Sequence, residues 1–187
     1  MLTAEQIAPK QAVPILRTTY HQLGELGVYQ GRRVQLIYGT VIDMSPMGTP
    51  HANAIRLLTR YFVKGAPEEV EVMVQLPLAA AVDSEPEPDF AFIRQLEGPT
   101  EDHPSTALLV VEVADSSLKL DLGPKASLYA ECRIPEYWVI DLKARSTVVH
   151  RLPKKGKYSS VRRVPWSSTL TSDPTGLSVK FAELLVP

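Results

Sequence analysis

The sequence predicts a mixed α/β (α+β) fold, with a mixed central β-sheet flanked by helices and an N-terminal β-hairpin. Three observations lead to this class. Two apolar runs near the N-terminus are separated by only two turn residues. A helical pattern follows, and a second helical pattern separates two strongly apolar runs that are typical of strands buried on both faces. Such an order of strands and helices indicates a sheet with helices on its faces.

The N-terminal part predicts a lead-in, a short helix and a hairpin. Residues 1–17 are weakly patterned, and we expect an arm or a docked lead-in there. Residues Thr18–Leu26 can form a short helix. Arg33–Ile37 and Thr40–Met44 are apolar runs joined by Tyr38-Gly39, and this spacing predicts a tight β-hairpin.

The next part predicts a long helix and two strands. Thr49-Pro50 is typical of a helix N-cap followed by proline in the first turn. Apolar residues then recur at helical spacing up to Gly65, which predicts the first long helix. Val70–Leu76 and Asp89–Ile93 predict two strands joined by an acidic, proline-rich loop.

The second half predicts the centre of the sheet. Leu108–Val113 is almost entirely apolar and should be a central strand buried on both faces. Pro124–Arg133 predicts the second helix, Glu136–Asp141 and Thr147–Arg151 predict two strands, and the remainder should add edge structure. We expect residues 1–187 to form a single domain, since this length is usual for one hydrophobic core.

Composition narrows the class of protein. Cys132 is the only cysteine, which excludes a disulfide framework within one chain and suits a reducing cytoplasm. No run approaches the roughly 20 apolar residues of a membrane span, so we expect a soluble, cytoplasmic protein. The net charge of -1 means that nucleic acid would need a local basic surface. The basic run from Arg151 to Arg163 is either such a surface or a solvated hairpin.

Two carboxylates lie at the ends of predicted strands. Asp89 begins one strand and Glu112 lies near the end of another, where a buried charge is costly unless a partner neutralises it. A divalent cation is one such partner, because Mg²⁺ or Mn²⁺ needs only one or two protein carboxylates beside water and substrate phosphate. The alternative is structural: Asp89 caps its strand, and Glu112 points to solvent or to a surface lysine.

Lys125 and His51 lie on the apolar faces of the two predicted helices. Lys125 precedes Leu128, Tyr129 and Cys132 at i+3, i+4 and i+7. Its ammonium either extends into water or reaches the two carboxylates, where it could orient an attacking water and offset charge on a phosphate. His51 is either a structural histidine or a member of the same site.

Several short motifs between about residues 18 and 185 occur together. They are Leu36-Ile37-Tyr38-Gly39, Met44-Ser45-Pro46 before His51, Pro88-Asp89, Val111-Glu112-Val113, Asp121 with Lys125 and Tyr129, and the run from Ile134 to Asp141. In this combination the chain resembles the Uma-two family of "putative restriction endonucleases", within the PD-(D/E)xK nuclease superfamily.

The resemblance implies a restriction-endonuclease-like core with a metal site. Asp89 and Glu112 match the family's metal carboxylates, and the backbone carbonyl of Val113 would be a further ligand. The superfamily usually has a lysine two residues after the glutamate, but Ala114 stands there, so the lysine role would have migrated to Lys125.

One position departs from the family pattern. The family commonly has glutamate in its first hairpin strand, where this chain has Gln35. Glutamine keeps a hydrogen-bond acceptor and loses the charge, so Gln35 would orient groups rather than attract a cation.

The resemblance favours an endonuclease that hydrolyses DNA phosphodiester bonds with Mg²⁺ or Mn²⁺ and without a small-molecule organic cofactor. Lys125 would position water or stabilise the transition state, and His51 would help to orient that water. The alternative is a catalytically impaired relative that acts as a nucleic-acid-binding or assembly module, and a third possibility is RNA or branched DNA as the substrate. A homodimer is compatible with the hypothesis, because nucleases of this superfamily often pair to cut two strands.

Overall fold

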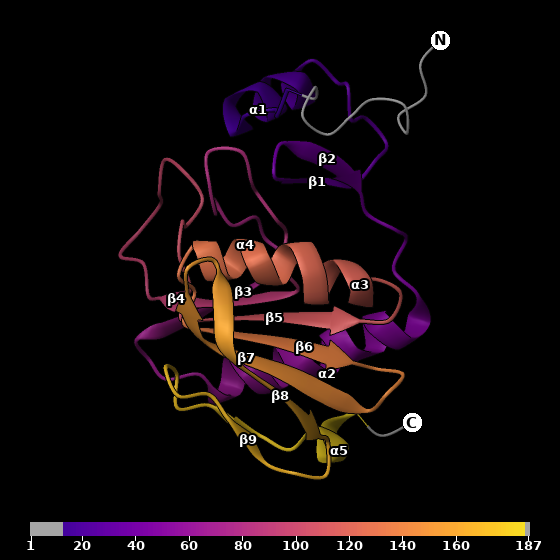
Figure 1. Ribbon diagram of the computed structural model, residues 1–187, viewed down its shortest axis with the longest axis vertical. Helices are drawn as coiled ribbons and strands as arrows, with labels where there is room; N and C mark the ends of the chain where they lie inside the picture. The colour runs from indigo at the N-terminus through magenta and orange to yellow at the C-terminus, as the bar shows by residue number, and fades with distance from the viewer. Residues whose placement is uncertain (1–12, 186–187) are drawn as a thin grey trace.

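A six-stranded mixed sheet forms the centre of the computed structural model, which describes residues 13–185 (Figure 1). In spatial order its strands are β3 (Val70–Val74), β4 (Phe90–Arg94), β5 (Leu109–Ala114), β6 (Glu136–Asp141), β7 (Ser146–Lys154) and β8 (Lys157–Pro165). β5 and β6 run parallel, and every other neighbouring pair is antiparallel. The predicted mixed sheet is therefore confirmed.

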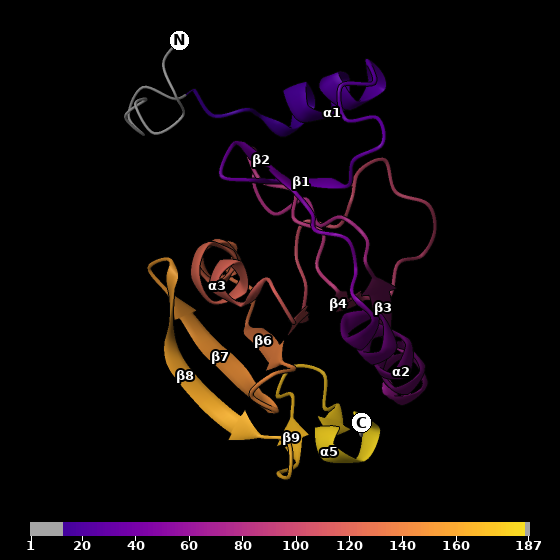
Figure 2. The same ribbon diagram turned by 90° about the vertical axis from the view of Figure 1, so that its right-hand side faces the viewer.

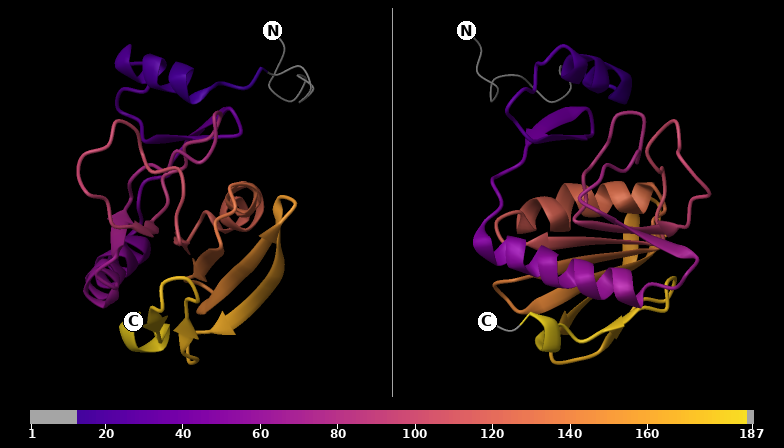
Figure 3. Two further views of the ribbon diagram at one scale, coloured as in Figure 1. Left: turned by 90° about the vertical axis from the view of Figure 1, so that its left-hand side faces the viewer. Right: turned by 180° about the vertical axis from the view of Figure 1, so that it is seen from behind.

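β5 lies in the middle of this sheet, between β4 and β6, as the sequence predicts. All six of its residues are buried, which explains why the strand is almost entirely apolar. One face of the sheet is covered by α2 (Thr49–Gly65), which is seen best from behind (Figure 3). The other face carries α3 (Leu118–Leu120), a π-helical turn (Asp121–Lys125) and α4 (Ala126–Glu131).

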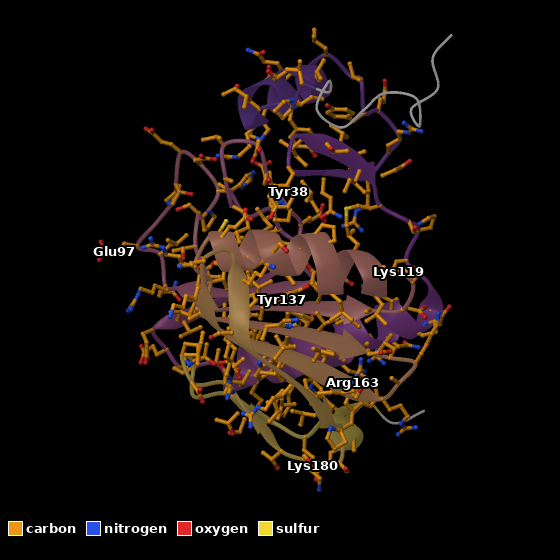
Figure 4. All side chains as sticks on the ribbon, in the orientation of Figure 1. Tyr38, Glu97, Lys119, Tyr137, Arg163 and Lys180 are labelled. Atoms are coloured by element: carbon orange, nitrogen blue, oxygen red, sulfur yellow. The ribbon has the colours of Figure 1, made fainter. Side chains whose placement is uncertain are left out.

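The alternation of side chains along β5 and β6 gives the sheet two separate cores. Val111 and Trp138 belong to the cluster under α2, where Phe62 lies edge-on against Phe90. The residues that alternate with them along the strands, such as Tyr137 beside Trp138, belong to the cluster under α4. Figure 4 labels Tyr137 on the sheet below that helix. Both faces of the central strands are thus filled with side chains.

The N-terminal elements form a layer above the sheet (Figure 2). They are α1 (Arg17–Glu25), β1 (Val34–Ile37) and β2 (Thr40–Asp43). β1 and β2 form the predicted hairpin, and its turn residues Tyr38 and Gly39 have φ angles of 48° and 68°. Such angles are typical of a tight two-residue hairpin turn, and glycine adopts them without strain.

Two contacts fix the hairpin in place. Residues 13–16 cross its turn, where the Ile15 amide donates to the Gly39 carbonyl at 3.0 Å. On the other side, the Glu85 amide donates to the Leu36 carbonyl at 2.7 Å. The hairpin is therefore tied to the loop that leads into β4. The rest of the predicted arm, residues 1–12, lies outside the described residues.

Two predictions about helix starts are wrong. The second helical segment begins at Leu118 and not at Pro124, which lies inside the π-helical turn. Proline has no amide hydrogen and disrupts a regular α-helical turn, whereas a wider turn leaves room for its ring. At the first long helix the N-cap is Gly48 and not Thr49, and no side chain caps it.

The C-terminal part adds the expected edge structure. It contains β9 (Leu170–Thr171), β10 (Ser178–Val179) and α5 (Phe181–Leu184), and Phe181 packs into the core under α2. The basic run forms the outer hairpin of β7 and β8, with exposed lysines at its tip. No helix within residues 13–185 has the length and apolar character to cross a membrane.

Candidate functional site

A cavity of about 240 Å³ lies where the N-terminal hairpin faces the start of α2, the end of β5 and the π-helical turn. Its lining includes all five side chains that the sequence singles out, which are Gln35, His51, Asp89, Glu112 and Lys125. These residues come from β1, α2, the approach to β4, β5 and the π-helical turn. The structure therefore brings together residues that are up to 90 positions apart in the sequence.

Asp89, immediately before β4, is held from three sides. Its Oδ2 accepts a hydrogen bond from the Val113 amide at 2.8 Å. Its Oδ1 accepts from Gln75 Nε2 at 3.2 Å and lies 3.1 Å from His51 Nε2. The carboxylate is therefore fixed to the end of β5, beside Glu112. Asp89 precedes the strand that it was predicted to begin.

Gln75 is a site residue that the sequence analysis missed. The backbone amide of Gln75 donates to the backbone carbonyl of Asp89 at 3.1 Å, and the Gln75 side chain lines the cavity. Its φ angle of 50° ends β3 two residues before the predicted end of that strand. A non-glycine residue in this region is held there by its surroundings, and here the surroundings are the backbone and carboxylate of Asp89.

His51 lies in the first turn of α2 and faces Asp89. Burial lowers the pKa of the ring, but the hydrogen bond to Asp89 and a contact with the Val113 backbone outweigh burial, so the pKa is raised. The raised pKa favours a protonated ring that donates to the carboxylate. His51 therefore contacts the groups that the family resemblance assigns to a metal ion.

Glu112 and Lys125 form a buried ion pair. Lys125 Nζ donates to Glu112 Oε1 at 2.7 Å, and the Tyr129 hydroxyl donates to the same oxygen at 3.0 Å. The lysine is only 3% exposed, so its ammonium does not extend into water. The structural alternatives for these two residues, a solvent-facing glutamate and an outward-pointing lysine, are therefore wrong.

Burial and charge act in opposite directions on this pair. Burial raises the pKa of Glu112 to about 8, although the neighbouring Lys125 lowers it. For Lys125 burial lowers the pKa, but the attraction of Glu112 and Asp121 is stronger and raises it. The ammonium is therefore held in its charged form, while the carboxyl group binds its proton more tightly than in water.

Asp121 is a second acid that lies beside Lys125. Its Oδ2 accepts from Ser117 Oγ at 2.5 Å, and its Oδ1 lies 3.9 Å from Lys125 Nζ. That Oδ1 is buried and has no hydrogen-bond partner among residues 13–185. Burial also raises the pKa of this carboxyl group. The sequence motif already names Asp121 with Lys125, and their i, i+4 spacing brings the two side chains together on the helical segment.

Gln35 is 4% exposed and faces the cavity from β1. Its Oε1 accepts from the Glu87 amide at 3.4 Å, just before the Pro88-Asp89 pair. This contact places the amide side chain beside the approach to β4. Asp141, in contrast, accepts from the Ala144 amide at 2.9 Å and does not line the cavity. Asp141 is therefore a structural acid at the end of β6 and is not part of the site.

The donors in the cavity fit a hard divalent cation. Six acidic residues line it, namely Asp43, Glu87, Asp89, Glu112, Asp115 and Asp121. Both hydrogen bonds to Glu112 end on Oε1, so among the described residues its Oε2 has no protein partner. Within residues 13–185 no three His, Cys, Asp or Glu side chains are arranged as a metal cage. Mg²⁺ does not require one, because one or two carboxylates and water complete its coordination.

A solved structure has the same fold. It is described as "a putative nuclease belonging to DUF820" from Anabaena variabilis, and it superposes with a TM-score of 0.70 over 92% of this chain and 100% of that chain. The sequences are 12% identical, so the match concerns the fold alone. No curated protein matches the chain.

A family comparison covers most of the sequence. The sequence model of the Uma2 family, described as "Putative restriction endonuclease", matches residues 17–182. This range contains the central sheet, the N-terminal hairpin and every residue of the cavity described above. The chain therefore belongs to the Uma2 (Uma-two) family, the family that its motifs resemble.

Proposed function

We propose that this chain is an endonuclease that hydrolyses DNA phosphodiester bonds in the cavity with the help of Mg²⁺ or Mn²⁺. The proposal rests on one observation. The same cavity is lined by Asp89, Glu112 and Lys125, which come from three different parts of the fold. Two carboxylates and a buried ammonium are the groups that a metal-assisted phosphate hydrolysis needs. Membership of the Uma2 family supports the same reaction class.

Asp89 and Glu112 are the residues that would hold the cation, together with the backbone carbonyl of Val113. When bound, the cation would polarise the phosphate and lower the pKa of a coordinated water. Asp89 is suited to this role because the Val113 amide and Gln75 fix its carboxylate. Glu112 is suited because its Oε2 has no protein partner among the described residues.

Lys125 supplies a fixed positive charge beside the reacting phosphate. The ammonium has three N–H donors, and one of them is directed at Glu112 Oε1. A remaining donor can bind the attacking water or an oxygen of the phosphate, on which negative charge grows in the transition state. Glu112 keeps the ammonium in place, and the Tyr129 hydroxyl holds Glu112 in turn, so the protein needs little reorganisation during the reaction.

His51 and Gln35 act on the geometry of the site. The raised pKa of His51 gives Asp89 a hydrogen-bond donor, which orients that carboxylate. Gln35 supports the backbone at Glu87, two residues before Asp89. Both side chains can also contact a bound water, because both line the cavity.

A cleavage assay tests the proposal. Wild-type protein is incubated with single-stranded DNA, double-stranded DNA or RNA, in the presence of Mg²⁺, Mn²⁺ or a chelator. We expect metal-dependent cleavage of DNA, at least about 100-fold slower in Glu112→Gln, because a residue that holds a catalytic metal is removed. The exposed Glu68 on the loop before β3 provides a control, Glu68→Gln, with the same loss of charge. Equal cleavage by wild type and Glu112→Gln would refute the proposal.

The presence of Gln35 favours a second candidate function. An uncharged residue where the family commonly has glutamate is consistent with an impaired nuclease that binds nucleic acid or assembles with a partner. Titration calorimetry separates the two functions. Binding of Mg²⁺ or Mn²⁺ below millimolar concentration supports the nuclease, whereas DNA binding without any metal binding supports the module.

A further inference from the structure

A second hollow adjoins the candidate site at the open end of the hairpin, where Val34 pairs with Asp43. This hollow has a volume of about 650 Å³ and is lined by Gly31, Arg32 and Arg33 from the chain before β1. Its other wall is Asp43 and the segment 44–47, and that segment, Asp43 and Arg33 also line the cavity with the carboxylates. The two hollows therefore lie next to each other along these shared residues, and we refer to them together as the groove.

The charged side chains differ between the two ends of this groove. The inner end contains Asp89, Glu112 and Asp121, whereas the outer end contains two guanidinium groups and only one carboxylate, that of Asp43. A cation is favoured at the inner end and an anion at the outer end. This order of charges suits a phosphodiester chain that has a divalent cation at one phosphate and arginine at the next.

Both arginines are available for an external anion. Arg32 Nε lies 3.6 Å from Asp43 Oδ2, and the two side chains are 66% and 57% exposed. Arg33 forms an ion pair with Glu87, and its side chain is 49% exposed. Ion pairs in such exposed positions stabilise a protein little, and a guanidinium with five N–H donors can bind a phosphate oxygen beside its first partner.

The shared wall of the groove is largely apolar. It contains Met44, Pro46 and Met47, and Met47 is 41% exposed. Methionine side chains are unbranched and polarisable, so they adapt to flat apolar surfaces such as a nucleotide base. The outer end of the groove thus offers a surface for a base beside two donors for its phosphate.

We propose that this outer groove binds the nucleotide next to the scissile phosphodiester, with Arg32 and Arg33 as the ligands of its phosphate. The inference rests on the proposed function and adds a substrate subsite to it. The substrate strand then runs along the hairpin, from the carboxylates to the two arginines, and the methionine-lined wall faces a base.

The test compares two pairs of arginines. The double variant Arg32→Ala/Arg33→Ala removes the charge of the groove, and Arg56→Ala/Arg60→Ala removes the same charge from exposed positions of α2 that line neither hollow. Binding of a fluorescein-labelled DNA 12-mer is followed by fluorescence anisotropy at several salt concentrations. Ca²⁺, another hard cation with oxygen ligands, replaces Mg²⁺ in this measurement. Urea unfolding verifies that both variants remain folded.

We expect the groove variant to bind the DNA about 10-fold more weakly than wild type, since charge-assisted hydrogen bonds are lost. The slope of log K against log salt should fall by about 1 to 2 in magnitude, one for each lost phosphate contact. In the cleavage assay KM should rise more than kcat falls, because neither arginine contacts the carboxylate pair.

Equal affinities and salt slopes of the two double variants would overturn the subsite while cleavage by wild type still supported the nuclease. If wild-type protein neither bound nor cleaved DNA, the proposed function itself would fail. The two failures are therefore distinguishable by the behaviour of the wild type alone.

Discussion

Replacement of Lys125 by methionine tests the buried ion pair between Lys125 and Glu112. The side chain keeps its length and its place on the helical segment, but the ammonium 2.7 Å from Glu112 Oε1 is lost. Glu112 is 4% exposed and retains only the Tyr129 hydroxyl as a donor. A buried carboxylate then either remains charged without a cation or takes up a proton.

The cost follows from the burial of both partners. Removal of one partner of a buried ion pair typically destabilises a protein by about 3–5 kcal/mol. The pKa of Glu112, already raised to about 8 by burial, rises further without Lys125. A group with a raised pKa loses its stability contribution as the pH increases toward that pKa. In wild type the stability stops falling once Glu112 is deprotonated, near pH 8. In the variant the pKa of Glu112 is higher, so the stability continues to fall above pH 8. The difference in stability between the two proteins is therefore larger at pH 9 than at pH 6.

Urea unfolding in the presence of a chelator measures this difference. Trp138 and Trp166 are 0% and 5% exposed, and their fluorescence reports the opening of the core. Lys119→Met on α3 removes an exposed lysine from the same segment, labelled in Figure 4, and should change the stability by less than about 0.5 kcal/mol. The double variant Glu112→Gln/Lys125→Met should recover most of the loss, since no charge is left unpaired. A loss below about 1 kcal/mol for Lys125→Met at pH 9, above the pKa of Glu112, would refute the buried ion pair.

Three further predictions concern the site and its hairpin. In chelator, wild-type stability should fall between pH 4.5 and pH 8 with a slope of up to about 1.4 kcal/mol per pH unit, and Glu112→Gln should flatten this slope in urea titrations. Gln35→Glu adds a charge to an acidic cavity, so it should lower the melting temperature without metal and increase the gain that Mg²⁺ produces; equal Mg²⁺ shifts in both proteins would contradict this. Gly39→Ala should cost about 1–3 kcal/mol, because φ is 68° and the new Cβ would lie 2.3 Å from Pro14 Cβ, whereas Gly31→Ala has nothing within 4 Å and should cost less.

The sheet could be predicted because its strands alternate between two buried faces or are buried on both. β1, β2, β5 and β6 agree with their predicted bounds to within one residue, and the almost entirely apolar character of β5 predicted its central position. The start of the second helical segment could not be predicted. Pro124 is typical of a first helical turn, and the π-helical turn around it depends on contacts such as the hydrogen bond from the Tyr137 hydroxyl to the Asp121 carbonyl.

The site could be predicted in part for a simple energetic reason. Charged residues such as Glu112 and Lys125 on apolar elements need partners, and here they are each other's partner. Asp121 was named only as part of a motif and given no role, because the predicted helix began at Pro124 and left Asp121 outside it. Gln75 was missed because a glutamine at the end of a strand carries no pattern, and its contact with Asp89 exists only in the folded chain.

The central claim is that Asp89 and Glu112 hold a divalent cation. Diffraction from crystals grown with Mn²⁺, recorded at the manganese absorption edge, tests this claim most directly. We expect an anomalous peak in contact with both carboxylates and the Val113 carbonyl, and no such peak in Glu112→Gln crystals. A peak at other residues, or none at millimolar Mn²⁺, would contradict it.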